Sequence, residues 1–206
     1  MMTNLLSSSV ARLRFLLVML VTICVSAEVW GETWSHEFTS LPSISDQKFI
    51  VNDLTWNVTT TIGKGSPEIT LGNDNSIKSM KFGSGQKNYY SNIALSTSYF
   101  SNYNVKSVEI IGCGNTTNNI NIIVTQGSNE NIVTIGSATI NKSYASNWNT
   151  ISECIKTINT NEGSGGLLTI SISPTTCAFS LRKITVTYEE GITEPSRCLV
   201  QKLVVH

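Results

Sequence analysis

Apolar and polar residues alternate one by one through most of the chain beyond residue 47. The runs are rich in Ile, Val, Thr and aromatic residues, and Gly, Asn, Ser or Pro separates them. In order, they read KFIVNDLTWNVTT, PEITL, SIKSMKF, NIALSTS, VKSVEII, NINIIVTQ, NIVTIGSAT, LLTISIS and AFSLRKITVTYEE. A period of two is typical of strands with one buried and one solvated face. The pattern therefore predicts an all-β protein, an antiparallel β-sandwich of jelly-roll-like type.

Strand parity also predicts which side chains face the core. In DLTWNVT, Trp56 has the same parity as Leu54 and Val58, so we expect its ring to be buried. Only one segment has helical spacing: NWNTISECIKTIN places apolar residues three or four positions apart, which predicts a short helix or turn. The helix–strand alternation that a parallel sheet requires is absent from the sequence.

The N-terminal segment has the pattern of a secretory signal peptide. Arg12 and Arg14 precede the apolar run FLLVMLVTICVSA, which ends at Ala27 in a small-residue cleavage site. This run is shorter than the roughly 20 residues that a membrane-spanning helix needs. The sequence therefore predicts a protein that is secreted or held at the cell surface, with no membrane span after cleavage.

Three parts of the chain follow from these patterns. Residues 1–27 are expected to be the signal peptide, and residues 28–190 the β-sandwich domain. The alternation stops after TVTYEEG, so residues 191–206 are interpreted as a linker or the truncated start of a further element.

The charge of the chain excludes one class of partner. Charged residues make up 14% of the sequence and the formal net charge is zero. Soluble domains usually carry roughly 25% charged residues, and nucleic-acid-binding domains are usually basic. We therefore expect no nucleic-acid partner, and a surface made polar by Asn, Ser and Thr.

Four cysteines follow the predicted signal peptide: Cys113, Cys154, Cys177 and Cys198. In an oxidising compartment they can pair, and four cysteines allow three connectivities. Cys198 lies beyond the last predicted strand, so one bridge is expected among the other three, with Cys154–Cys177 preferred. A zinc site is not indicated, because the chain has no C-x-x-C pair with a nearby His.

A family resemblance accompanies these patterns. The order DLTWNVTTT, SIKSMKFG, VKSVEIIGCG and LLTISISPTTCAFSLRKITVTYEE, over about residues 33 to 190, resembles a module of secreted bacterial multi-domain proteins. Such modules are similar to galactose-binding-like or carbohydrate-binding jelly rolls. The resemblance implies adhesion or carbohydrate association, and it supplies no binding motif whose residues could be carried over.

The sequence gives little support for a catalytic site or a metal site. His36 and Glu37 are adjacent, so on a strand they point to opposite faces. The acidic residues that a glycosidase would need are scattered and form no motif: Asp53, Glu68, Asp74, Glu109, Glu130 and Glu153. We expect no enzyme activity and no cofactor.

A structural calcium ion remains an open alternative at GNDNS, through Asn73, Asp74 and Asn75. Calcium takes six to eight oxygen ligands, and one carboxylate offers few of them, so a plain turn is favoured there.

Sugar binding requires less than catalysis does: it needs only aromatic rings for stacking, with side-chain amides beside them for hydrogen bonds. Tyr89, Tyr90 and Tyr103 lie in or beside Asn/Ser-rich stretches and are the candidate ligand-binding residues. Three N-x-S/T sequons, at Asn57, Asn115 and Asn141, predict glycosylation in a eukaryotic secretory pathway, with Asn115 the expected exposed acceptor. In a bacterium they carry no such meaning.

The leading hypothesis is a non-catalytic extracellular β-sandwich module that binds carbohydrate or another cell-surface polymer. The alternative is a structural or adhesive spacer domain of a larger secreted protein, with no small-molecule ligand. A glycoside-acting enzyme is the third, and it would need two acids brought together by the fold.

Overall fold

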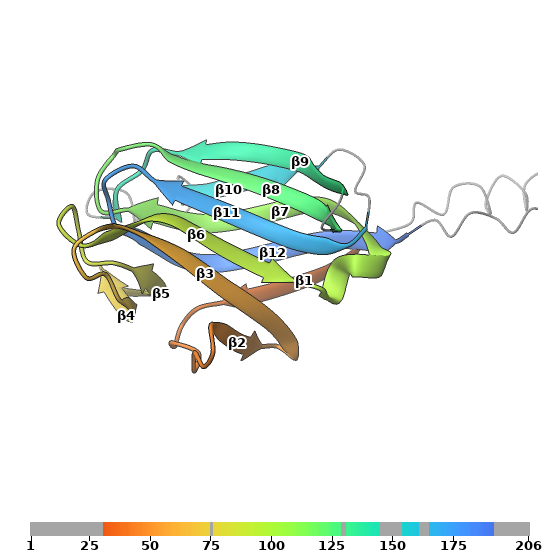
Figure 1. Cartoon of the computed structure of the whole chain (residues 1–206), viewed down its shortest axis with the longest axis horizontal. Coiled ribbons are helices and arrows are strands. Elements are labelled where there is room, and N and C mark those ends of the chain that lie inside the picture. Colours follow the sequence, from red (N-terminus) through yellow and green to blue (C-terminus); the bar gives the residue numbers. More distant parts are fainter. Residues whose placement is uncertain (1–30, 75, 129–130, 145–153, 161–164, 192–206) are drawn as a thin grey trace, which may run out of the picture. The chain divides into compact units, whose positions relative to one another are not determined.

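The chain folds into two antiparallel β-sheets that pack face to face (Figure 1). The computed structural model describes residues 31–74, 76–128, 131–144, 154–160 and 165–191. Within the described residues each sheet has six strands, and most buried apolar side chains of the two sheets form one cluster between them. Ile111, Cys113 and Cys154 form a second, smaller cluster. The predicted antiparallel β-sandwich is therefore confirmed.

The first sheet, sheet A, has the strand order β10–β7–β12–β5–β4, with β1 paired to β12. Its strands are β1 (Glu32–Glu37), β4 (Ile69–Asp74), β5 (Ile77–Phe82), β7 (Tyr103–Gly114), β10 (Ile155–Asn159) and β12 (Phe179–Glu190). The second, sheet B, has the order β2–β3–β6–β11–β8–β9. Its strands are β2 (Lys48–Val51), β3 (Leu54–Lys64), β6 (Tyr89–Thr97), β8 (Ile120–Ser128), β9 (Asn131–Ile140) and β11 (Leu167–Pro174). A short 3-10 helix, η1 (Tyr99–Asn102), joins β6 to β7.

The period-two pattern explains which side of each strand faces the core. In β11, Leu168, Ile170 and Ile172 are fully buried, whereas the intervening Thr169 and Ser171 are half-buried on the opposite face. A one-residue shift in pairing would exchange these two sets, so the hydrophobic pattern fixes the register of the strand.

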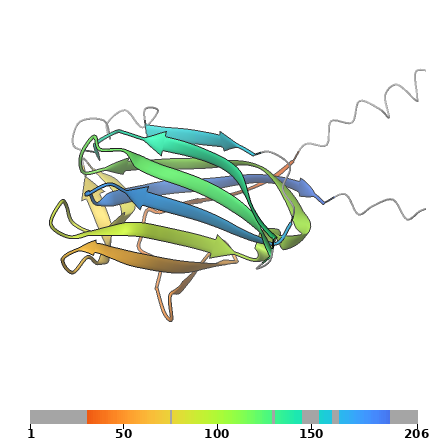
Figure 2. The same ribbon diagram turned by 45° about the horizontal axis from the view of Figure 1, so that its top comes forward.

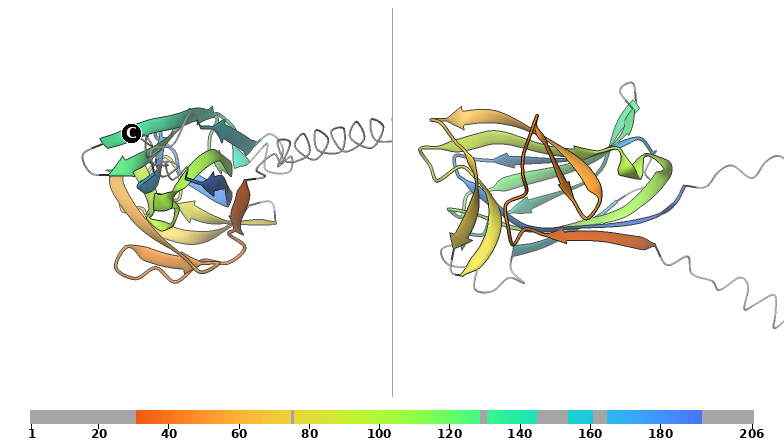
Figure 3. Two further views of the ribbon diagram at one scale, coloured as in Figure 1. Left: turned by 90° about the vertical axis from the view of Figure 1, so that its right-hand side faces the viewer. Right: turned by 90° about the horizontal axis from the view of Figure 1, so that it is seen from below.

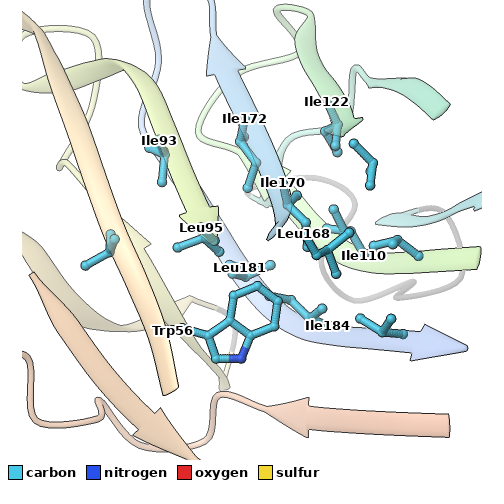
Figure 4. Close-up of a cluster of buried hydrophobic side chains, with 14 of the residues drawn as sticks. Trp56, Ile93, Leu95, Ile110, Ile122, Leu168, Ile170, Ile172, Leu181 and Ile184 are labelled. Atoms are coloured by element: carbon cyan, nitrogen blue, oxygen red, sulfur yellow. The ribbon is translucent and has the colours of Figure 1, made fainter. Parts of the chain in front are cut away.

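The core centres on Trp56 of β3, which is fully buried as its strand parity predicts (Figure 4). It belongs to one cluster with Leu95 of sheet B and with Leu181 and Ile184 of sheet A. A buried tryptophan removes a large apolar area from water, which makes this contact a main source of stability.

Tight turns hold β2 at the edge of sheet B. Asn52 and Asp53, between β2 and β3, have φ angles of 48° and 61°. Asp46 and Gln47 precede β2 with φ angles of 50° and 59°. Two successive positive φ angles are typical of type I′ turns, in which Asn and Asp are well tolerated.

The disulfide pairing differs from the predicted one. Cys113 of β7 is bonded to Cys154, with their Cα atoms 5.9 Å apart, and Cys177 is a buried free thiol. The cause is strand pairing: β10 begins directly after Cys154 and runs antiparallel to β7, with Ile155 opposite Ile111. The prediction of one bridge among these three cysteines is confirmed, but the Cys154–Cys177 pair is wrong.

The predicted helix is also corrected in its described part. Residues 155–159 form β10 instead of a helical turn, and Ile158 is buried opposite Val108 of β7. Pairing with β7 overrides the helical spacing of the apolar residues, since tertiary contacts outweigh local preference in short segments.

Several predictions lie outside the described residues. The signal peptide (1–27), Asn75 of the calcium alternative, residues 147–153 of the predicted helix and the C-terminal segment after residue 191, with Cys198, belong to this group. The boundaries of the domain also stay predictions. Within the described parts of the chain, no helix is long and apolar enough to cross a membrane.

Candidate functional site

The outer face of sheet B carries rows of small uncharged side chains. Strand pairing places these residues side by side across β3, β6, β11, β8 and β9, which Figure 2 shows as one layer. We call this surface the neutral face, and it consists of Asn57, Thr59, Thr61, Asn92, Ala94, Ser96, Thr169, Ser171, Ser173, Asn121, Ile123, Thr125, Thr134, Ser137 and Thr139. None of these residues is charged.

The rows follow directly from the register. One row runs from Asn57 through Ser96, Thr169 and Thr125 to Thr134. A second row contains Thr59, Ala94, Ser171, Ile123 and Ser137, and a third contains Thr61, Asn92, Ser173, Asn121 and Thr139. Neighbouring strands lie about 4.8 Å apart and alternate residues of one strand about 6.8 Å apart, so the face is a regular array of hydroxyl and amide groups.

Some of these groups are oriented by hydrogen bonds to each other. Ser173 Oγ donates to Asn92 Oδ1 at 3.3 Å, and Thr139 Oγ1 donates to Asn121 Oδ1 at 3.1 Å. Both bonds join adjacent strands. They fix the orientation of each Asn amide: the Oδ1 accepts within the sheet, and the Nδ2 is turned toward other partners.

Two hollows lie at opposite edges of the neutral face. A hollow of about 470 Å³ between β8 and β9 is lined by Asn121, Ile122, Ile123, Ser137, Ala138 and Thr139. Another of about 400 Å³ lies beside β2 and is lined by Ser43, Ser45, Asp46, Lys48, Phe49, Ile50 and Thr55. The charged side chains Asp46 and Lys48 thus stand at the border of the array.

The outer face of sheet A has a different character. Glu109 lies in the middle of it, between Thr157 and Thr185 of the neighbouring strands. In the register of β12 and β1, Lys183 lies opposite Glu37. Charge is therefore spread over sheet A, and its absence from the centre of sheet B is a local feature of that face.

The three predicted tyrosines do not form one site. Tyr90 is 7% exposed, its ring packs edge-on against Phe82, and its hydroxyl donates to the Pro67 carbonyl at 2.8 Å. The expectation that Tyr90 lies on the surface is therefore wrong. Tyr89, the preceding residue on β6, points the other way, and its ring lies over Gly63 at one corner of the neutral face.

Tyr103 is the first residue of β7 and belongs to a separate aromatic cluster with Tyr99 of η1. Its ring stacks on Tyr99 with centroids 6.1 Å apart and meets Tyr188 edge-on at 4.9 Å. Burial, together with hydrogen bonds to Tyr99 and Glu32, raises the pKa of Tyr188 above its ordinary value. Tyr99 is 47% exposed, although its ring also contacts Phe100 and Tyr188.

The candidate catalytic groups stay apart. His36 packs edge-on against Phe38, with ring centroids 4.8 Å apart, whereas Glu37 forms an ion pair with Arg182. Asp74, the one carboxylate of the calcium alternative, is bound to Lys81 at 3.3 Å. Among the described residues, no group of three or more His, Cys, Asp or Glu could hold a metal ion.

The sequons occupy three different environments. Asn57 lies within the neutral face, where its Nδ2 donates to the Ser96 carbonyl at 3.5 Å. Asn115 is half-buried, because its Oδ1 accepts the backbone N–H of Ala178 at 2.8 Å, so it is not the exposed acceptor expected. Asn141, at the end of β9, is exposed.

The neutral face could not have been predicted from the sequence, although the alternating Thr, Ser and Asn residues that form it can be recognised in the strands. Only the register between strands distant in the chain brings Asn57, Thr169 and Thr134 into one row.

No protein-family model and no curated protein sequence matches the chain. Solved structures do match it, and carbohydrate-binding modules are among them. One is the CBM36-1 domain of a multidomain xylanase from the hindgut metagenome of Trinervitermes trinervoides: 14% identity, TM-score 0.37, covering 64% of this chain and 95% of that domain. Another is chitosan-binding module 1 of a chitosanase/glucanase from Paenibacillus sp. IK-5: 13% identity, TM-score 0.37, covering 73% of this chain and 98% of that module.

The matches also include a catalytic protein, a family two carbohydrate esterase from Cellvibrio japonicus. It is 11% identical with a TM-score of 0.35, and the alignment covers 77% of this chain. The chain spans about a third of that esterase, or 35% of its length. Likenesses of this size carry no statement about ligand or activity, which have to be argued from this chain's own residues.

Proposed function

We propose that this protein is a non-catalytic extracellular module that binds an uncharged carbohydrate polymer across the neutral face of sheet B. The observation that carries the proposal is the array itself: hydroxyl and amide groups in register over five strands, with no charge among them. A carbohydrate chain presents the complementary groups, namely hydroxyl donors and acceptors at regular intervals.

The chemistry of the face favours a neutral ligand of modest affinity. Hydroxyl and amide groups can both donate and accept, so they exchange bonds with water for bonds with sugar at a net gain of about 0.5–1.5 kcal/mol each. Ile123, which is 42% exposed, and the ring of Tyr89 at the corner add apolar contact for C–H faces of the sugar. A dissociation constant between about 1 μM and 1 mM is the expected range.

Secretion and the lack of catalysis complete the proposal. The predicted signal peptide and the Cys113–Cys154 disulfide both fit an oxidising compartment. Two of the described acids are paired with cations, Asp74 with Lys81 and Glu37 with Arg182. A structural or adhesive spacer without a ligand is the competing function, and the experiment below separates the two.

The test compares two matched variants of the full secreted chain. Ser171→Arg places a long cation in the centre of the neutral face, between Ala94 and Ile123. Thr187→Arg makes the same kind of change on the outer face of sheet A, between Ser107 and Thr33. Binding to soluble neutral polysaccharides (β-glucan, xylan, galactan and mannan) is measured by affinity electrophoresis and calorimetry.

We expect the parent to bind at least one of these polymers. Ser171→Arg should weaken that binding at least about tenfold, since it blocks contacts and buries a charge, and Thr187→Arg should leave it unchanged. Failure of the folded parent to bind any polymer would favour the spacer. Equal binding by both variants would remove the site from sheet B.

A further inference from the structure

A small polar pocket lies at one end of the sandwich, and its lining residue Asn88 directly precedes Tyr89 at the corner of the neutral face. It is formed where β3 leads into β4 and where β5 leads into β6, at the end of the molecule that carries β4 and β5 (Figure 3). Its volume is about 250 Å³, and we call it the end pocket. It is lined by Ser66, Glu68, Thr70, Gly83, Ser84 and Asn88.

Asn88 ties the two connections together. Its Oδ1 accepts the backbone N–H of Ser66 at 3.2 Å, and its Nδ2 donates to Ser84 Oγ at 3.3 Å. Its backbone carbonyl accepts the N–H of Ser84 at 2.9 Å. One side chain thus orients a hydroxyl from the second connection and the backbone of the first, so the wall of the pocket is formed before any ligand arrives.

The segment that carries Glu68 is anchored in a similar way. The Glu68 carbonyl accepts the N–H of Gly83 at 2.9 Å, and the buried Tyr90 hydroxyl donates to the carbonyl of Pro67. Burial, together with the negative charge of Glu68, raises the pKa of the Tyr90 hydroxyl. Gly83 has a φ of 80°, and a Cβ there would come within 2.4 Å of the Asn88 carbonyl oxygen, so only glycine fits.

The groups around the pocket suit a hydroxyl-rich ligand better than a cation. Calcium takes six to eight oxygen ligands and prefers several carboxylates, whereas Glu68 is the one acidic residue among those that line the pocket. The Asn88 oxygen already accepts a backbone N–H, so the amide presents donors, which repel a cation. A carboxylate beside hydroxyls and an amide N–H can accept from one sugar hydroxyl and donate to the next.

The size of the end pocket limits the ligand. Sites for drug-sized molecules usually measure about 300–1,000 Å³, and the end pocket is smaller at about 250 Å³. It has room for about one sugar ring.

We propose that the end pocket binds a single neutral sugar residue or a similar polyol, with Glu68 accepting from ligand hydroxyls and Asn88 and Ser84 donating to them. This site is separate from the neutral face and does not require it. The two differ in ligand: the neutral face takes a polymer, and the end pocket takes one ring.

Nuclear magnetic resonance of the ¹⁵N-labelled full chain tests the proposal directly. Glucose, galactose, mannose and N-acetylglucosamine are added one at a time. We expect at least one of them to shift the amide signals of Ser66, Ser84 and Asn88 in a saturable way, and to leave Ser171 of the neutral face unmoved.

Two variants with the same chemical change provide the control. Glu68→Gln removes the charged acceptor from the pocket and should weaken sugar binding about tenfold or more, because hydrogen bonds to charged groups are the stronger ones. Glu109→Gln, on the outer face of sheet A, should leave it unchanged. Glu68 is exposed, so its variant is expected to fold, and the dispersion of the spectrum verifies this.

Three results would overturn the proposal: no saturable shift with any of the sugars, full binding by Glu68→Gln, or shifts at the pocket that calcium alone produces and EDTA reverses. The outcome is independent of the polymer test, because Ser171→Arg leaves the end pocket intact and Glu68→Gln leaves the neutral face intact. The experiments can therefore disprove either binding site without disproving the other.

Discussion

Trp34 and Trp56 pack with their ring centroids 5.5 Å apart although they belong to different sheets. Trp34 lies on β1 of sheet A and Trp56 on β3 of sheet B, so the pair joins the two layers of the sandwich. Among the described residues, neither indole N–H has a hydrogen-bond partner, although both nitrogens are buried. The contact therefore stabilises the fold through packing and not through hydrogen bonding.

Substitution of Trp56 tests this account. Trp56→Ala should lower the free energy of unfolding by about 3–5 kcal/mol, the usual cost of emptying a large aromatic site in a core. Trp56→Phe should cost much less, because a ring remains and no hydrogen bond is lost. Urea denaturation followed by circular dichroism gives both values. An equal loss in the two variants would show that the indole nitrogen contributes through a partner.

The disulfide gives a second prediction. Cys113→Ser should lower the free energy of unfolding by about 2–4 kcal/mol, since the bridge constrains the unfolded chain, across a sequence separation of 41. Cys177→Ala removes a free thiol and should cost less. Peptide mapping without reduction should recover Cys113 linked to Cys154. Recovery of Cys154 linked to Cys177 would restore the pairing preferred from the sequence and contradict the structure.

The strands were predictable because their pattern is local. Alternation in LLTISIS fixes that Leu168, Ile170 and Ile172 face the core, and the same parity placed Trp56 there. Segments whose structure depends on a distant partner were not predictable. Residues 155–159 form a strand only because β7 lies beside them, and the same pairing brings Cys154 to Cys113.

The candidate site shows the same limit. Tyr89 and Tyr90 are neighbours in sequence with equally polar surroundings, yet strand parity turns one outward and buries the other at 7% exposure. Tyr103 is close to both in sequence, but the length of β6 separates them in space. The neutral face depends on the register of five strands, which no stretch of sequence reveals by itself.

His36 gives a pH-dependent prediction. Burial lowers the pKa of His36 from its ordinary value of 6.5, against opposing effects of Asn52 and Glu37. The unfolded chain then binds this proton more readily than the folded one, so the free energy of unfolding falls as the pH drops below 6.5 toward the folded pKa. Above that pH the stability is fully retained.

The test compares the parent with His36→Gln, which cannot titrate. Urea midpoints are measured at about pH 7.5 and about pH 5.5, which bracket the ordinary histidine pKa of 6.5 and lie above the ordinary pKa values of carboxylates. The parent should lose more stability between the two conditions than the variant does. Equal losses would mean that other groups cause the acid sensitivity.

The neutral face predicts how binding responds to salt. Surface charges are screened over about 10 Å at 0.1 M salt, so an interaction built on them weakens as salt is added. The central rows carry no charge, whereas Lys48 of the edge strand β2 lies opposite Asn57 at the end of one row, and Asp46 lines the hollow beside β2. The dissociation constant for a neutral polysaccharide should therefore change less than about twofold between about 0.05 M and 0.5 M sodium chloride. Calorimetry at the two salt concentrations measures this, and a Lys48→Gln variant reports on the border charge. A steep loss of affinity that Lys48→Gln abolishes would move the binding site from the rows of sheet B to the hollow beside β2.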